Sequence, residues 1–241
     1  MTKSEVMSLL EQHQNSRGIE HWQKMSNTQG LSSYGIGLTV HRKLAKKVGR
    51  DHDLALALWQ TTNYDAKVIS LLIDEPKKLT RTQIEEQVES LGIGLLTHVF
   101  SSCDATLPRA PFAFELAQEW LVHTDPIRRR CAYGLIYEFS KKHSKKDNEK
   151  VSQQFYLDVI AKIENELHIE PVNMRVSMGA ALMGIGKRNL ELNTEALRVA
   201  KLLGPIDFNE DGQKCDPMNI EKHLTSDYLK QKLGIVYVTL P

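Results

Sequence analysis

The segment that best indicates the fold is Asp125-Pro-Ile-Arg-Arg-Arg-Cys-Ala-Tyr-Gly-Leu-Ile-Tyr-Glu-Phe-Ser-Lys-Lys142. The carboxylate of Asp125 can accept hydrogen bonds from the N–H groups that the first turn of a helix leaves unpaired. Pro126 follows at the first helical position, where the missing N–H of a proline costs nothing. The segment therefore predicts a helix that begins at Asp125 and ends at about Lys142.

The same signals recur on both sides of this segment. Apolar residues repeat at helical spacing, as Ile84, Val88 and Leu91 do. Capping residues precede such stretches, and Gly or Pro follows them. The further helices that we predict cover residues 4–14 with Ser4 as the cap, 37–48 ending at Gly49, Asp51 or Asp53 to Trp59, Asn63 to Pro76, Thr80 to Gly92, a helix from Pro111, and 148–167, 171–187 and 194–203 with Asn193 near its start.

Helices of this kind, joined by short linkers, predict an all-α fold. Pairs recur at roughly 35–45 residues, which is typical of HEAT or armadillo-like repeat arrays, so we expect a curved solenoid. The longest polar loop is Ser26–Gly35, and residues 234–241 are the only strand-like segment. We expect one HEAT-like domain over 1–241, with the helical array in 1–204 and a loop, helix and tail in 205–241. An ordinary helical bundle is the alternative.

Composition narrows the class of protein. The chain has 241 residues, of which 41% are hydrophobic and 25% charged, values that exclude wholesale disorder. No apolar run approaches the ~20 residues of a membrane span. The charged N-terminal residues do not suit a signal peptide, and three cysteines without a close pair favour reduced thiols. We therefore predict a cytoplasmic protein that acts as a monomer away from membranes.

Basic residues are concentrated in two segments, although 31 Lys and Arg nearly balance 30 Asp and Glu. Residues 41–50 hold five basic residues and no acid, and residues 128–150 hold eight against three acids. A phosphate backbone responds to such a local stripe and not to the net charge. Runs of charge are also common on solvated faces, and this stays open for Lys141–Lys150. The Arg128–Arg130 row indicates phosphate binding more strongly, because Arg makes forked contacts.

Catalytic motifs are mostly missing. The sequence has no His-Glu-x-x-His, no Gly-x-Ser-x-Gly and no Walker A pattern. Cys215 has Asp211, Asp216 and His223 nearby, but one cysteine alone does not predict a metal site. We therefore expect neither a metal nor a cofactor. His98 lies in an apolar stretch and is either a hydrogen-bonded core residue or a catalyst.

Several segments resemble the DNA alkylation repair family of the AlkD type. They are Tyr34-Gly-Ile-Gly-Leu-Thr-Val-His-Arg-Lys-Leu-Ala-Lys46, Leu58-Trp59, Asn63-Tyr-Asp-Ala-Lys-Val-Ile-Ser-Leu-Leu72, Pro111-Phe-Ala-Phe-Glu-Leu-Ala-Gln-Glu-Trp120 and Asp125–Ala132, and the resemblance covers roughly residues 1–200. It implies HEAT-like helix pairs that cradle duplex DNA in a basic concave groove. The family's enzymes are glycosylases that excise cationic N-alkylated purines.

The resemblance also implies where a catalytic site would lie. In the family, an Asp follows a Trp by four residues on one helix face, a second Trp completes an aromatic cleft, and an Arg holds a phosphate. The alignment places Gly94 and His98 at the first Trp and the Asp, Ala180 at the second Trp, and Arg130 at the Arg. A carboxylate stabilises an oxocarbenium-like sugar, whereas an imidazole does not.

We therefore predict a DNA-binding protein without the standard excision residues, which recognises DNA through its backbone and shape. One alternative is an active glycosylase with a rearranged site that uses His98, with Glu89 as its acid. A second is a helical scaffold that binds protein. The predicted DNA contacts are Arg42, Lys43, Lys46, Lys47, Arg128, Arg129, Arg130, Lys187 and Arg188.

Overall fold

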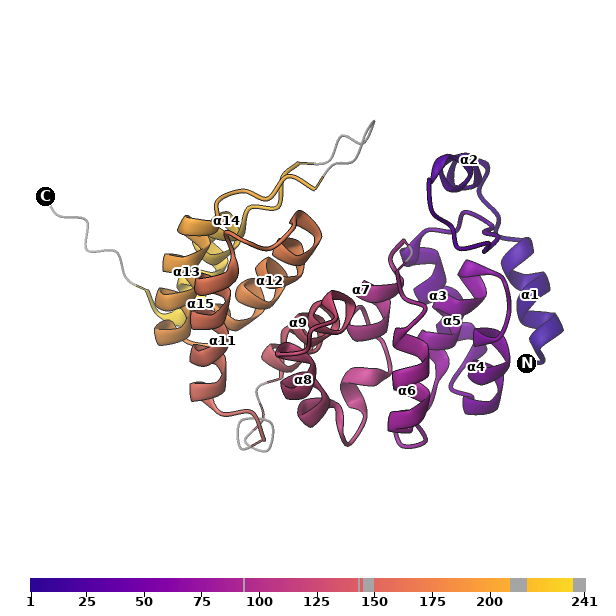
Figure 1. Ribbon diagram of the computed structural model, residues 1–241, viewed down its shortest axis with the longest axis horizontal. Coiled ribbons are helices and arrows are strands. Elements are labelled where there is room, and N and C mark those ends of the chain that lie inside the picture. Colours follow the sequence, from indigo (N-terminus) through magenta and orange to yellow (C-terminus); the bar gives the residue numbers. More distant parts are fainter. Residues whose placement is uncertain (93, 143, 145–149, 209–215, 236–241) are drawn as a thin grey trace, which may run out of the picture. The chain divides into compact units, whose positions relative to one another are not determined.

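The computed structural model describes residues 1–92, 94–142, 144, 150–208 and 216–235 (Figure 1). Its described residues form helices and two isolated β-bridges but no strand, which confirms the all-α prediction. The helices are α1 (Lys3–Glu11), α2 (Ser16–Lys24), α3 (Leu38–Val48), α4 (His52–Trp59), α5 (Tyr64–Ile73), α6 (Arg81–Val88), α7 (Leu96–Ser101), the 3-10 helix η1 (Leu107–Arg109), α8 (Ala113–Leu121), α9 (Pro126–Ser140), α11 (Gln153–Glu166), α12 (Val172–Ile185), α13 (Leu190–Leu203), α14 (Ile220–Leu224) and α15 (Asp227–Leu233).

The chain divides into two compact units, Met1–Leu116 and Ala117–Pro241. The expectation of one continuous domain over residues 1–241 stays a prediction.

Helix α5 forms the centre of the first unit. All of its residues except Lys67 are buried, and it packs against α1, α3, α4 and α7. Asn63 caps it, as the sequence predicts, because the Asn63 side chain accepts a hydrogen bond of 2.9 Å from the Ala66 N–H. Each fully buried aliphatic side chain contributes roughly 1.5–3 kcal/mol, so burial holds this helix in place.

A buried carboxylate on α5 sets the start of α3. Asp65 is fully buried and accepts hydrogen bonds from Ser33 Oγ (2.8 Å), the backbone N–H groups of Tyr34 (2.7 Å) and Ile36 (3.2 Å), and His41 Nε2 (2.9 Å). Burial alone would raise the pKa of Asp65, but the hydrogen bonds from His41 and its other partners outweigh burial and lower that pKa. The loop before α3 and the first turn of α3 are therefore fixed to the core.

The sequence did not predict α2, and it misplaced the start of α1. Thr2 caps α1 in place of Ser4, with its side chain accepting from the Glu5 N–H. Helix α2 is short, buries none of its residues fully and carries only two large apolar side chains, Ile19 and Trp22. It is held instead by Trp22, whose ring lies 4.6 Å from the Tyr64 ring and whose Nε1 donates to the Leu31 carbonyl (3.0 Å).

The second unit is built around α9 and α12, which pack along each other. The Asp125 side chain accepts from the N–H groups of Ile127 (3.0 Å) and Arg128 (3.4 Å), so the predicted cap of α9 is confirmed. Helices α11 and α14 both pack on α13. A Cβ added at Gly184 on α12 would lie 2.2 Å from Ser140 Oγ on α9, so only glycine permits this close approach of the two helices.

The predicted start of α13 at residue 194 is wrong by one turn. The helix begins at Leu190, after an Asn189 cap whose side chain accepts from the Leu192 N–H. Asn193 lies inside the helix, where its buried Nδ2 donates to the carbonyls of Gly186 (2.9 Å) and Leu224 (3.3 Å). Two Asn residues stand near this end, and tertiary packing decides which of them acts as the cap.

Helix α15 ends at Gly234, whose positive φ of 69° suits glycine. Residues 236–241, which the sequence indicated as strand-like, lie outside the described residues. So does Cys215.

Candidate functional site

The outer face of α3 carries the first basic segment. His41, Leu44 and Ala45 are buried against the core. The four basic residues between and after them are exposed; they are Arg42, Lys43, Lys46 and Lys47. Because Asp65 fixes the start of α3, this row of cations is presented by a rigid element.

A pocket of about 370 Å³ lies beside this face, within the first unit. We call it the basic pocket; its lining residues are Arg42, Ala45, Lys46, Gly49, Arg50, Leu72, Asp104 and Arg109. Four of these are basic and one is acidic. The predicted contacts Arg42 and Lys46 are thereby brought together with two basic residues that the predicted set omits.

Arg50 and Arg109 are the omitted residues. Arg50 Nη1 donates to the carbonyls of Leu72 (2.9 Å) and Asp74 (2.8 Å) and to Thr106 Oγ1 (2.5 Å). Burial, and next the nearby charge of Arg109, lower the pKa of Arg50. Arg50 belongs to the basic run 41–50, so its charge was visible in the sequence. Arg109 lies far along the chain, and only the fold brings it here.

An ion pair lies at the edge of the basic pocket. Arg42 donates through Nε to Asp104 Oδ2 (2.7 Å), and both side chains are about half exposed. Cys103 and Asp104 have positive φ angles of 57° and 69°, a conformation that non-glycine residues seldom adopt. This turn after α7 directs the Asp104 carboxylate to Arg42.

His98 lies on α7 and is exposed, so it is not a core residue. Ser102 Oγ lies 3.1 Å from His98 Nδ1 and donates to the His98 carbonyl (2.7 Å). Cys103 Sγ lies 2.8 Å from His98 Nε2. The imidazole is thus held by the turn that ends α7.

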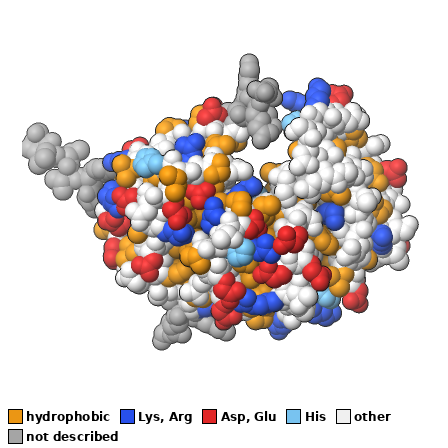
Figure 2. Space-filling view, viewed as in Figure 1, with side chains coloured by type: hydrophobic (Ala, Val, Ile, Leu, Met, Phe, Trp, Pro, Cys, Tyr) orange, Lys and Arg blue, Asp and Glu red, His pale blue; other side chains and the backbone are white. Residues whose placement is uncertain are grey.

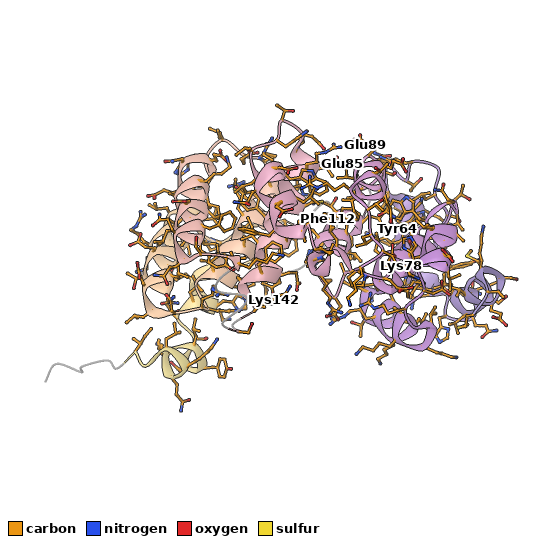
Figure 3. All side chains as sticks on the ribbon, turned by 90° about the horizontal axis from the view of Figure 1, so that it is seen from below. Tyr64, Lys78, Glu85, Glu89, Phe112 and Lys142 are labelled. Atoms are coloured by element: carbon orange, nitrogen blue, oxygen red, sulfur yellow. The ribbon has the colours of Figure 1, made fainter. Side chains whose placement is uncertain are left out.

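Gly94 does not share a helix with His98. It precedes α7 in a left-handed conformation (φ 51°), and a Cβ there would meet the Tyr64 ring at 3.1 Å. Figure 3 shows Tyr64 among the helices of the first unit, and its hydroxyl accepts from the Leu95 N–H (3.0 Å). The family's Trp and Asp, four residues apart on one helix face, therefore have no equivalent arrangement at Gly94 and His98. Ala180, aligned with the second Trp, is half-buried on α12.

The three consecutive arginines of α9 have different surroundings. Arg128 pairs with Asp125 (2.9 Å), and Arg129 pairs with Glu170 (2.9 Å) and donates to the carbonyls of two residues before the helix, His123 and Thr124. The Nε of Arg130 is buried without a hydrogen-bond partner in the described part of the chain. Burial lowers the pKa of Arg130. An unpaired buried donor costs about 1–3 kcal/mol, so an added acceptor at Arg130 would stabilise it.

Arg188 has internal partners. Its Nη1 donates to the carbonyls of Ser140 (2.8 Å) and Lys142 (2.6 Å) at the end of α9, and its guanidinium lies 4.7 Å from the Tyr156 ring centroid. Burial, and next the charge of Lys232, lower the pKa of Lys187. That Lys187 and Arg188 contact DNA stays a prediction.

Charges of both signs are mixed over the face drawn in Figure 2, where Lys and Arg side chains lie among Asp and Glu. Within the described ranges, no group of three His, Cys, Asp or Glu residues is arranged to hold a metal ion. The same ranges contain no helix of sufficient length and apolarity to span a bilayer.

Comparison with known proteins places these features in a family. Two curated relatives, the uncharacterized proteins Lmo0209 of Listeria monocytogenes and Lin0241 of Listeria innocua, are each 21% identical over 224 residues, covering 89% of this chain and 92% of theirs. One solved structure matches with a TM-score of 0.79 and 20% identity over 97% of both chains. It represents a family of proteins related to the HEAT-like repeat DNA glycosylases with affinity for branched DNA structures, so the fold is HEAT-like.

The resemblance found in the sequence is confirmed by a family model. The model of the DNA alkylation repair enzyme family matches residues 6–209. The matched range includes α3 with its basic face, the segment from Gly94 to His98, and the arginines of α9. The chain therefore belongs to the DNA alkylation repair enzyme family.

Proposed function

We propose that this protein binds DNA, with a preference for branched or otherwise distorted duplexes, and does not excise alkylated purines. One observation carries the proposal: basic side chains from α3, the turn after it and η1 converge on the basic pocket and its edge. Positive charge gathered in this way attracts a phosphate backbone, whatever the net charge of the whole chain.

Exposed lysines extend this charge along α3. The side chains of Lys43, Lys46 and Lys47 make no hydrogen bond or ion pair with any residue that the structure describes. Each can contact a phosphate without first breaking an internal contact, so each adds to the salt dependence of binding. In the second unit, Arg130 has an unpaired buried Nε that a phosphate oxygen would satisfy.

The preference for distorted DNA follows from the kind of contact. Phosphate contacts carry no sequence information, so discrimination depends on the shape and deformability of the duplex. A relative of the same fold has affinity for branched DNA structures, which supports extending this preference to the present chain.

Base excision is excluded from the proposal on chemical grounds. The developing sugar cation needs a carboxylate, and the aligned position holds His98, whose imidazole contacts Ser102 and Cys103. Gly94 supplies no aromatic wall. Losing one such electrostatic contact costs about 3–4 kcal/mol of transition-state stabilisation.

The test is a binding titration against intact, nicked and branched duplexes, with a base-release assay on alkylated DNA. We expect the branched duplex to bind most tightly, and no release of 3-methyladenine or 7-methylguanine above the spontaneous rate. Release that His98→Ala abolishes would establish the rearranged glycosylase instead. Absence of binding to every duplex would favour the protein-binding scaffold.

Variants of α3 assign the binding to this surface. Lys43→Gln with Lys47→Gln should reduce the slope of log Kobs against log salt by about two, because about 0.9 of a unit is lost for each phosphate contact. Lys24→Gln on α2 is the matched control, since Lys24 is exposed in the same unit but lies on another helix. Equal slopes for the double variant and the control would contradict the assignment.

A further inference from the structure

We propose that the basic pocket binds the terminal phosphate of a nucleic acid strand, a phosphomonoester, and so gives the protein a preference for phosphorylated strand ends. This inference rests on the proposed DNA binding and adds which phosphate the pocket takes. Strand ends occur at nicks and flaps, so the preference would direct the protein to interrupted duplexes.

The size of the basic pocket fits a strand end. Its volume of about 370 Å³ lies within the roughly 300–1,000 Å³ of small-molecule pockets. Ala45 and Leu72, both buried, form the apolar part of its lining. A phosphate with its sugar suits such a lining, with the phosphate at the cations and the sugar against the apolar side chains.

The guanidinium of Arg50 is preorganised to bind a phosphate. All three of its hydrogen bonds leave from Nη1, which fixes the plane of the guanidinium. Its Nε and Nη2 donate to no residue that the structure describes. A guanidinium has five N–H groups. Two of them are on Nη1, so the one on Nε and the two on Nη2 remain for a ligand.

Arg109 and Lys46 add further positive charge, and neither side chain has a hydrogen bond or ion pair with a residue that the structure describes. Burial, and next the repulsion from Arg109, lower the pKa of Arg50. An anion between the two guanidinium groups would remove this repulsion.

The charge of the pocket favours a monoester over a diester. Four cations and one carboxylate line it, a formal excess of three positive charges. A phosphomonoester carries about −1.5 to −2 at pH 7 and has three free oxygens. A diester carries a single charge, and its strand must continue on both sides. A strand can end in a recess, whereas a continuous strand must enter it and leave again.

Asp104 opposes the ligand at the edge of the pocket. It holds Arg42 in an ion pair, and its own charge repels a phosphate. Asp104→Asn removes that charge and with it the ion pair to Arg42. Asn tolerates the left-handed φ of 69° about as well as Asp, so the turn should persist. This variant should therefore bind phosphorylated ends more tightly than the wild type.

The experiment compares one nicked duplex in three forms: with a 5′-phosphate at the nick, with a 3′-phosphate, and with hydroxyls on both sides. We expect at least one phosphorylated form to bind about tenfold more tightly than the hydroxyl form. Lys46→Gln with Arg109→Gln should abolish the difference without unfolding the protein, because neither side chain makes a hydrogen bond or ion pair with a residue that the structure describes. Lys24→Gln should preserve it, and Asp104→Asn should enlarge it.

Three results would overturn the inference. Equal binding of all three forms would refute the end preference while leaving DNA binding intact. A preference that survives Lys46→Gln with Arg109→Gln would place the phosphate site elsewhere. If thymidine 5′-monophosphate binds as tightly as the phosphorylated strand, the pocket serves a free nucleotide. Absence of binding to every duplex form would instead refute the proposed function itself.

Discussion

Asp65 shows how a single residue connects the core to the candidate interface. It is fully buried on α5, yet its four hydrogen-bond donors lie in the loop before α3 and in α3 itself. The segments that resemble the family, Tyr34–Lys46 and Asn63–Leu72, contain His41 and Asp65 themselves. Part of the resemblance is therefore a structural network that positions the basic helix.

Replacing Asp65 tests this network. Asp65→Asn should lower the free energy of unfolding by about 3 kcal/mol, because it leaves buried donors without their charged acceptor. Asp53→Asn, at an exposed position on α4, should change it by less than about 0.5 kcal/mol. Urea unfolding followed by circular dichroism measures both. Equal effects of the two changes would show that Asp65 is not a structural centre.

The Asp65 variant should also show a defined pH dependence. Because the folded-state pKa of Asp65 is lowered, its carboxylate stabilises the fold above its unfolded pKa of about 3.9, and this is lost as pH falls through the folded pKa. The stability difference between wild type and Asp65→Asn should be constant from about pH 5 upward and shrink below about pH 4. A difference that grows on acidification would contradict the lowered pKa.

Gly94, which the resemblance aligns with the family's first Trp, has a left-handed conformation beside the Tyr64 ring. Gly94→Ala should cost about 1–2 kcal/mol, because a left-handed φ is strained for a side chain and the Cβ meets the Tyr64 ring. Gly94→Asn adds the same Cβ but tolerates the left-handed φ, so it should cost less.

His98→Asp alone should release no alkylated purine, because an aromatic wall cannot be supplied from Gly94. Thermal unfolding and the base-release assay measure these effects, and purine release by His98→Asp would contradict the account.

At the scale of the element, the three consecutive arginines of α9 have different internal partners. Arg129 ties the start of the helix to Glu170, whereas Arg130 has an unsatisfied buried donor. Arg129→Gln should therefore lower stability by about 2 kcal/mol. Arg130→Gln should change stability little and reduce the salt slope of DNA binding by about one. Thermal unfolding and salt titrations compare the two, and the reverse ranking would refute these roles.

The elements themselves were largely predictable from sequence, since their caps are local. Asn63, Thr80 and Asp125 each cap the helix that the sequence assigned to them. Helix α2 was not predicted, because it is short and buries none of its residues fully; Trp22 holds it against the Tyr64 ring. The start of α13 was misplaced because the Asn193 side chain donates to two carbonyls in the core. This contact depends on tertiary packing, which the local sequence does not show.

The candidate site was only half predictable for the same reason. The α3 cations were visible as a run of charge, as was Arg50. The approach of Arg109 to Arg50 depends on how η1 packs within the first unit, so spacing along the chain gave no sign of it. The contact between His98 and Cys103 likewise depends on a turn with two positive φ angles.

The whole molecule has a formal charge of only +1, yet its basic residues are concentrated on particular elements. The first unit supplies α3 and the basic pocket, and the second unit supplies Arg130. Binding through such local positive charge releases condensed counterions from DNA, so it must weaken steeply as salt is raised. Binding through apolar contacts, as expected of a protein scaffold, would not weaken in this way as salt is raised.

The most direct test of DNA binding through these basic side chains is therefore the salt dependence of binding to a branched duplex. The equilibrium constant should be measured between about 50 and 200 mM salt, for the wild type and for Lys43→Gln with Lys47→Gln. We expect a wild-type slope of log Kobs against log salt of about −4 or steeper, reduced by about two in the double variant. A wild-type slope near zero, or the same slope in both proteins, would contradict it.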